Sequence, residues 1–175
     1  MGAKMLGFLK KLFGSNKPQI RGIILVLTDE ESEGTAFVKD YVLKSPSASK
    51  LELVVFGDAK DYGEGARDVM FLPEAKNLKG MLVVIDSLGK AFSKFPRREK
   101  VAKIILDIAK RNQVILVAKP EDYDSVLEIL DRSVEAVYKP DLRGGKVKVE
   151  YSGISGEFRL EDLAGVDIFR LEITS

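Results

Sequence analysis

The chain of 175 residues contains no cysteine and no histidine. Without cysteine it can have no disulfide framework, no thiolate metal site and no cysteine nucleophile. Without histidine it lacks the commonest general base and the commonest metal ligand, and a Ser-His catalytic triad is excluded.

Long hydrophobic runs are also missing. No apolar run approaches the roughly 20 residues that a membrane-spanning helix needs. The N-terminus is basic, but it lacks the uninterrupted apolar region and the Ala-x-Ala site that mark a secretory signal. With 45% apolar and 31% charged residues, the composition is typical of one globular domain with a sizeable core. We expect a cytoplasmic protein, whose composition is thermophile-like.

Acidic residues are absent from the first 28 positions. Five basic residues lie in this stretch: Lys4, Lys10, Lys11, Lys17 and Arg21. The whole chain has a formal net charge of +1, so the remainder is net acidic. This distribution gives no strong signal for nucleic-acid binding.

Residues 4–13 form a short amphipathic segment, and residues 14–18 then break the pattern with glycine and proline. The apolar side chains at helical spacing are Met5, Phe8, Leu9 and Leu12. We therefore divide the chain into an N-terminal segment and linker, residues 1–18, and a single α/β domain, residues 19–175. A helix of about ten residues is unstable alone in water. We expect it to dock on its own domain, on a protein partner or on a second copy, with peripheral membrane contact as a further alternative.

Strand and helix patterns alternate over most of the domain. Largely apolar runs predict parallel strands buried on both faces, at residues 22–28, 51–56, 81–85 and 114–118. Shorter runs predict strands at residues 69–72 and 136–139. Periodic apolar positions predict helices at residues 35–44, 97–111 and 121–130.

The pattern changes near the C-terminus. Alternating polar and apolar residues predict antiparallel strands with one wet face at residues 146–151, 157–160 and 166–173. The expected fold class is therefore α/β: a three-layer, mostly parallel sheet flanked by helices, with antiparallel β-strands at the C-terminal edge.

The run at residues 81–85 leads directly into Asp86. In open α/β sheets ligands bind at the carboxyl ends of the strands, and Asp29, Glu30 and Asp58 also follow predicted strands. Carboxylate oxygens are the ligands that Mg²⁺ and Ca²⁺ favour, so Asp29 and Asp86 are candidate metal ligands. The alternative is that these acids are solvated strand ends and helix N-caps.

The chain resembles the RecA/KaiC-like P-loop ATPase core in four features. These are the strand-loop-helix start, the string Val83-Val84-Ile85-Asp86-Ser87-Leu88, the long amphipathic helix and the following run from Val114. The resemblance covers roughly residues 20–175. In that family a hydrophobic Walker B strand often ends in Asp-Ser, the next strand follows after one helix, and β-hairpins close the domain. The resemblance implies that Asp86 occupies the Walker B position.

The first loop departs from that family. A P-loop reads G-x-x-x-x-G-K-[ST], whereas residues 28–35 read TDEESEGT, with Thr35 at the hydroxyl position and Gly34 where the lysine belongs. Four acids occupy this segment: Asp29, Glu30, Glu31 and Glu33. Each repulsion at ~4 Å and an effective dielectric near 20 costs about 4 kcal/mol, which exceeds the roughly 0.3–2 kcal/mol from a helix dipole.

The resemblance therefore implies a degenerate Walker A loop. What it leaves is a vestigial nucleotide site at Thr35, Asp86 and Ser87. We expect no catalytic residues and no cofactor, with weak binding of a nucleotide or Mg²⁺ as the alternative.

A second resemblance, to response-regulator receiver domains, rests on the acid pair Asp29 and Glu30, on Asp86 as phosphoacceptor, and on Lys139 before a proline. Ala118 stands where a receiver has a hydroxyl. A receiver would also continue into a helix after Lys139, whereas this chain turns into β-structure.

The leading hypothesis is a non-catalytic regulatory or interaction module, derived from a RecA/KaiC-like nucleotide-binding domain that has lost ATP hydrolysis. The alternative is a pseudo-receiver signalling domain with Asp86 at the acceptor position. A third class is an enzyme that uses Asp86 and a metal, although no ligand cluster has diagnostic spacing.

Overall fold

The computed structural model describes residues 21–170, except for residues 71, 152 and 165. The predicted amphipathic segment at residues 4–13 and the linker up to residue 18 lie outside the described residues. Within the described part of the chain, no helix has the length and apolar character needed to cross a membrane.

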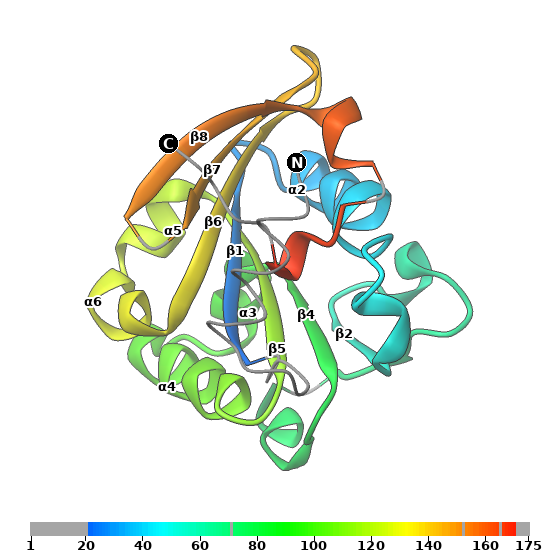
Figure 1. The fold of residues 1–175 in the computed structure, drawn as a ribbon. Coiled ribbons are helices and arrows are strands. Elements are labelled where there is room, and N and C mark those ends of the chain that lie inside the picture. Colours follow the sequence, from blue (N-terminus) through cyan, green and yellow to red (C-terminus); the bar gives the residue numbers. More distant parts are fainter. Residues whose placement is uncertain (1–20, 71, 152, 165, 171–175) are drawn as a thin grey trace.

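An eight-stranded sheet forms the middle of the domain, in the order β3-β2-β4-β5-β1-β6-β7-β8 (Figure 1). The first six strands in that order run parallel. In chain order these are β1 (Gly22–Leu27), β2 (Leu53–Phe56), β3 (Arg67–Asp68), β4 (Leu82–Asp86), β5 (Gln113–Ala118) and β6 (Val134–Asp141). Two antiparallel strands, β7 (Lys146–Tyr151) and β8 (Ile154–Arg159), extend the sheet beyond β6. The expected fold class is confirmed.

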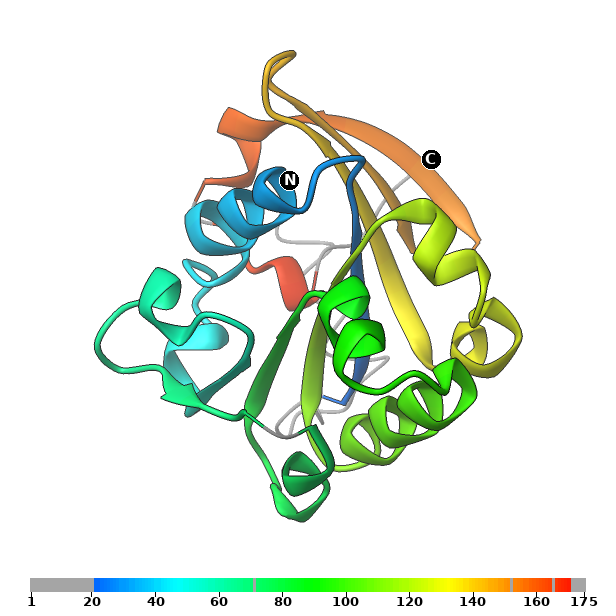
Figure 2. The same ribbon diagram turned by 180° about the vertical axis from the view of Figure 1, so that it is seen from behind.

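Among the described residues, four α-helices cover one face of the sheet, as the view from behind shows (Figure 2). They are α3 (Leu88–Lys94), α4 (Arg98–Ala109), α5 (Pro120–Asp124) and α6 (Leu127–Leu130). The other face is covered by α2 (Glu31–Phe37), the π-helical turn Val38–Val42 and two 3-10 turns, Leu160–Leu163 and Ile168–Arg170.

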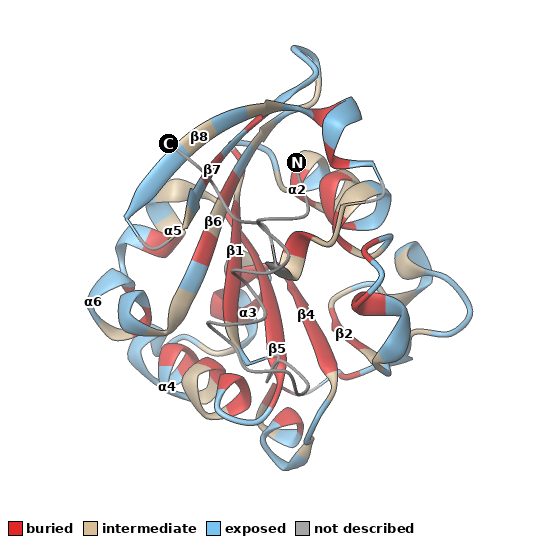
Figure 3. Cartoon of the chain, in the orientation of Figure 1, coloured by how far each residue is buried: buried red, intermediate tan, exposed pale blue. Residues whose placement is uncertain are grey.

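Side chains of the central strands alternate between these two apolar layers. Ile23 and Leu25 of β1 pack into the layer of α3 to α6, whereas Ile24 and Val26 pack into the layer of α2. The central strands β1, β4 and β5 are therefore buried on both faces (Figure 3). This two-sided burial explains why their sequences are uninterrupted apolar runs.

The outer strand β7 behaves as its alternating sequence predicts. Val147 and Val149 are buried, whereas Lys148 and Glu150 are exposed on the other face. Across the strands, Lys139 of β6 pairs with Glu150 at 3.5 Å. The wet face is thus covered by solvated charges, which contribute little stability individually.

Two predicted strands are wrong. The short third strand is Arg67–Asp68 rather than residues 69–72. The chain then enters a 3-10 turn, Leu72–Asn77, because Leu72 and Ala75, three residues apart, both turn into the core. The described part of residues 166–173 is likewise not a strand but ends in the 3-10 turn Ile168–Arg170.

Side chains rather than a neighbouring strand satisfy the backbone of this last segment. Ile168 N donates to Ser45 Oγ at 3.0 Å, and Tyr138 Oη donates to the carbonyl oxygen of Ile168, also at 3.0 Å. Both partners lie far away in the sequence, so the alternating pattern could not reveal them.

Two helices also differ from the prediction. The helix α3 was not predicted. Only Leu88, Ala91 and Phe92 of its seven residues are buried, so its sequence carries too short an apolar pattern to indicate a helix. The helix expected at residues 121–130 is divided into α5 and α6, because Ser125 and Val126 interrupt it.

The helix predicted at residues 35–44 begins earlier, at Glu31, so most of the expected acidic loop is the first turn of α2. Gly34 is buried in that turn. A Cβ atom there would lie 2.6 Å from Val117 Cγ1 and 3.0 Å from Thr28 Oγ1. The absence of a side chain at Gly34 thus lets α2 lie directly against β5.

We predict that Gly34→Ala lowers the free energy of unfolding by about 1–3 kcal/mol, because the added methyl overpacks against a β-branched residue in a buried strand. Helix propensity alone predicts the opposite sign, a gain of about 1 kcal/mol. Urea denaturation measures the change, and Ser32→Ala, at an exposed position of the same helix, serves as the control. A Gly34→Ala variant more stable than the parent would contradict the prediction.

Candidate functional site

Asp86 is the last residue of β4, and its carboxylate lies at the carboxyl edge of the sheet with only 4% of the residue exposed. Its Oδ2 accepts hydrogen bonds from Thr35 Oγ1 and Tyr62 Oη, both at 2.5 Å. Thr35 comes from α2, and Tyr62 comes from the 3-10 turn Ala59–Tyr62 that follows β2. Segments that leave three different strands therefore meet at one carboxylate.

The second carboxylate oxygen of Asp86 is different. Oδ1 is buried and has no hydrogen-bond partner among the described residues. Burial of an unpaired polar atom is costly, and most such atoms in folded proteins are paired. Oδ1 is therefore the atom of this site with free capacity to accept a hydrogen bond or to coordinate a cation.

The phenol of Tyr62 is held as a hydrogen-bond donor. Burial raises the pKa of Tyr62 well above its ordinary value of 10, and the charge of Asp86 and the hydrogen bond to it raise that pKa further. Ionised Tyr62 would place two negative charges side by side. The phenol is therefore held in its protonated form at neutral pH.

The backbone brings Tyr62 into reach of Asp86. Gly57 directly follows β2 and has a φ of 134°, in the region that favours glycine. A Cβ atom at Gly57 would lie 2.1 Å from the carbonyl oxygen of Asp86, which no side chain can tolerate. Gly57 therefore allows the ends of β2 and β4 to touch, and the following turn carries Tyr62 over the carboxylate.

Ser87 is buried beside Asp86, and the peptide bond between them is cis. Its Oγ accepts a hydrogen bond from Lys90 N at 3.3 Å, so Ser87 is the N-cap of α3. The structure thus brings Thr35 and Asp86 into contact, whereas the side chain of Ser87 caps α3. A role of these three residues in binding a nucleotide remains a prediction.

The remaining predicted acids are at the surface. Asp29 and Glu30 are exposed in the turn between β1 and α2, and exposed Asp58 caps the 3-10 turn by accepting from Lys60 N at 3.2 Å. No group of three or more carboxylates arranged to hold a metal occurs in the part of the chain that the structure describes. Metal binding by Asp29 and Asp86 remains a prediction.

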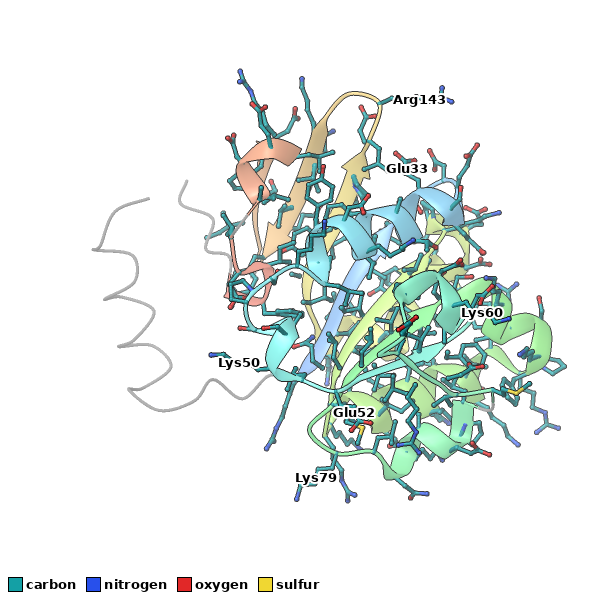
Figure 4. All side chains as sticks on the ribbon, turned by 90° about the vertical axis from the view of Figure 1, so that its right-hand side faces the viewer. Glu33, Lys50, Glu52, Lys60, Lys79 and Arg143 are labelled. Atoms are coloured by element: carbon teal, nitrogen blue, oxygen red, sulfur yellow. The ribbon has the colours of Figure 1, made fainter. Side chains whose placement is uncertain are left out.

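Glu33, another acid of the expected loop, has a structural partner. Its Oε1 accepts a hydrogen bond from Leu142 N at 2.9 Å. This bond ties α2 to the turn between β6 and β7, which also carries Arg143, and Figure 4 shows Glu33 and Arg143 at the same end of the molecule. Glu33 thus stabilises the contact between a helix and a hairpin.

Lys139, the residue that the receiver resemblance requires near Asp86, lies on β6. Two strands, β5 and β1, separate β6 from β4, which amounts to three strand spacings, or about 14 Å. Its ammonium group pairs with Glu150 at 3.5 Å. Lys139 is therefore not positioned to act on a phosphoryl group at Asp86.

Sequence reasoning missed Tyr62, which falls in a segment rich in glycine and charge. The available signal was the spacing of Ala59 and Tyr62, three residues apart, which fits one turn of 3-10 helix. It also missed the concentration of basic residues on α3 and the start of α4. There the signal was plain in the sequence: Lys90, Lys94, Arg97, Arg98, Lys100 and Lys103.

No protein-family model and no curated protein sequence matches this chain. Among solved structures, "The cytoplasmic domain of EssC" is similar, with a TM-score of 0.51 and 10% sequence identity. The similarity covers 78% of this chain and 37% of that one, so the chain spans just over a third of the neighbour's length. At this identity the likeness is one of fold alone, an α/β arrangement shared with a cytoplasmic domain.

We predict that Tyr62→Phe lowers the free energy of unfolding by about 1–3 kcal/mol, because the buried carboxylate loses one of its two donors. Tyr41→Phe is the matched control, since no hydrogen bond of the Tyr41 hydroxyl is found among the described residues and its ring stacks on Phe37. Urea denaturation of both variants gives the comparison. Equal stability of the two variants would refute the structural role of the phenol.

The raised pKa of Tyr62 also predicts a pH dependence. The folded state keeps the phenolic proton above pH 10, where the unfolded chain releases it, so the folded state binds more protons there. Stability therefore falls as pH rises above about 10, and the fall is shallower in Tyr62→Phe. Denaturation midpoints measured between pH 9 and pH 11 test this, and parallel slopes in the two proteins would show that Tyr62 ionises normally.

Proposed function

We propose that this chain is a non-catalytic regulatory or interaction module in which a RecA/KaiC-like nucleotide site has become a structural contact and ATP hydrolysis has been lost. One observation carries the proposal: Asp86 Oδ2 accepts from both Thr35 and Tyr62. In the RecA/KaiC-like family that the chain resembles, the residues at the positions of Asp86 and Thr35 hold Mg²⁺ beside a nucleotide. Here these two side chains bind each other, and a tyrosine closes over them.

The environment of Gly34 supports the loss of the phosphate site. The position that a P-loop gives to its lysine is filled by packing between α2 and β5, with Val117 and Thr28 in contact distance of any added Cβ. A lysine at position 34 could not be accommodated unless α2 moved away from the sheet. At this position the chain therefore departs from a P-loop in its packing as well as in its sequence, which keeps only Thr35 of the four fixed residues.

Charge supports the same proposal. Asp29 and Glu30 are exposed at the end of β1, and Glu31 is half-buried at the first position of α2. A nucleotide triphosphate bound there would meet three carboxylates instead of a lysine. Repulsion of about 4 kcal/mol for each close pair opposes tight binding.

Weak binding of Mg²⁺, alone or with a nucleotide, would use Asp86 Oδ1, which the hydroxyls of Thr35 and Tyr62 leave unpaired. Contact with partners through residues 4–13 belongs to the same proposal, as does a cytoplasmic location. The pseudo-receiver alternative gains no support from the geometry, since Asp86 is buried and Lys139 lies three strands away.

The decisive experiment is a steady-state ATPase assay of the full chain with Mg²⁺. We expect no turnover above background in the parent protein, and the same result for Tyr62→Phe, which reopens one side of Asp86. Turnover near 1 s⁻¹ or faster, within the ordinary enzyme range, would overturn the proposal if Asp86→Asn abolished it. Asp58→Asn, an exposed acid at the same edge of the sheet, controls for a general loss of negative charge.

A further inference from the structure

Positive charge is concentrated on α3 and the beginning of α4. Six basic residues lie there, with Glu99 as the only acid within residues 90–103. We call this set the α3–α4 basic surface: Lys90, Lys94, Arg97, Arg98, Lys100 and Lys103. All six are exposed, and within the described residues none of them forms an ion pair with a carboxylate. The chain as a whole is nearly neutral, so this surface is a local excess of charge.

Two clefts adjoin this surface, and they share Lys90 and Ser93 in their linings. The larger, of about 620 Å³, extends from α3 towards the start of α4 and the turn after β5, where Arg98 and half-buried Lys119 line it. The smaller, of about 420 Å³, extends from α3 towards the end of β2, where Lys94 lines it. The clefts therefore lie on either side of the exposed ridge of α3, a helix that Figure 2 shows in front of the sheet.

The larger cleft opens where the connections that follow neighbouring strands turn to opposite faces of the sheet. The connection after β1 leads to α2 on one face of the sheet, whereas those after β4 and β5 lead to α3 and α5 on the other. In open α/β sheets, ligands bind in the crevice that such a divergence creates at the carboxyl ends of the strands. The position of this cleft is thus that of a binding site.

Aromatic rings hold two of the cations in place. The guanidinium of Arg98 lies 4.6 Å from the ring centroid of Phe92, and the ammonium of Lys94 lies 5.3 Å from that of Phe56. Each cation–π contact restricts a long side chain while leaving its outward N–H groups available. The planar fork of Arg98 can then receive a carboxylate through two parallel hydrogen bonds.

We propose that an extended acidic segment of a partner protein binds across the α3–α4 basic surface and occupies both clefts. This inference rests on the proposed function as an interaction module and names the chemistry of its partner. Aspartate and glutamate side chains of the segment pair with Lys90, Lys94 and Arg98. The ridge of α3 lies beneath the middle of the bound segment.

The acids of the clefts favour a peptide over a polyphosphate. Glu31 and Asp122 line the larger cleft, and Asp58 lines the smaller one. A nucleic-acid strand would bring a phosphate charge against these carboxylates at every nucleotide. A peptide instead offers backbone N–H donors to them.

The test is selection of binders from a random twelve-residue peptide library displayed on phage, with the full chain immobilised. We expect enrichment of peptides rich in aspartate and glutamate. Fluorescence anisotropy then measures binding of the selected peptides to two variants of equal net charge. Lys90→Glu with Arg98→Glu reverses the charge at the clefts, and Lys39→Glu with Lys148→Glu reverses it at exposed positions elsewhere.

We expect the cleft variant to bind the selected peptides at least about tenfold more weakly, and the control variant to bind within about twofold of the parent, because close charge pairs matter more than net charge. Urea denaturation confirms that both variants fold. Selected peptides without acidic enrichment, or equal loss in both variants, would overturn the proposal. So would failure of the selection, or tighter binding of an oligothymidine that the cleft variant abolishes. The ATPase result stands in each case, so the two proposals fail separately.

Discussion

Burial of one carboxylate at the centre of the sheet edge determines how the surrounding segments are arranged. Asp86 is almost completely removed from water, so its charge must be stabilised by donors from the chain itself. Thr35 supplies one from the helix on one face, and Tyr62 supplies the other from the turn after β2. The next residue, Ser87, caps the helix on the opposite face. The two layers and the sheet between them are thus joined at this point.

The middle of the fold could be predicted from sequence because two-sided burial leaves a strong pattern. The runs at β1, β4 and β5 are apolar at nearly every position, and no other arrangement hides such strands from water. The segments at the periphery of the domain could not be predicted in the same way. The segment around Ile168 alternates like a strand, but its backbone bonds to Ser45 and Tyr138, which are more than a hundred and about thirty residues away, respectively. Such partners become adjacent only after folding.

As with the fold, only part of the candidate site could be predicted from the sequence. Family resemblance placed Thr35 and Asp86 together, and they do meet. Tyr62 was not foreseen, because its approach depends on the close contact that Gly57 permits between the ends of two strands. The basic residues of α3 and α4 were visible in the sequence as a charge excess. The function of these residues was not visible, since the clefts beside them form only where α3 meets segments that follow β1, β2 and β5.

The two ends of the sheet have a consequence for behaviour in concentrated solution. A strand edge with free backbone groups can recruit a strand from another molecule and so start aggregation. At one end β3 has only two residues, both charged. At the other end β8 carries Glu157 and Arg159, which form ion pairs with Lys146 and Glu161. Short or charged edge strands disfavour the addition of a strand from another molecule. The strongly apolar strands of the interior are therefore kept apart from neighbouring molecules by edge strands that do not extend the sheet.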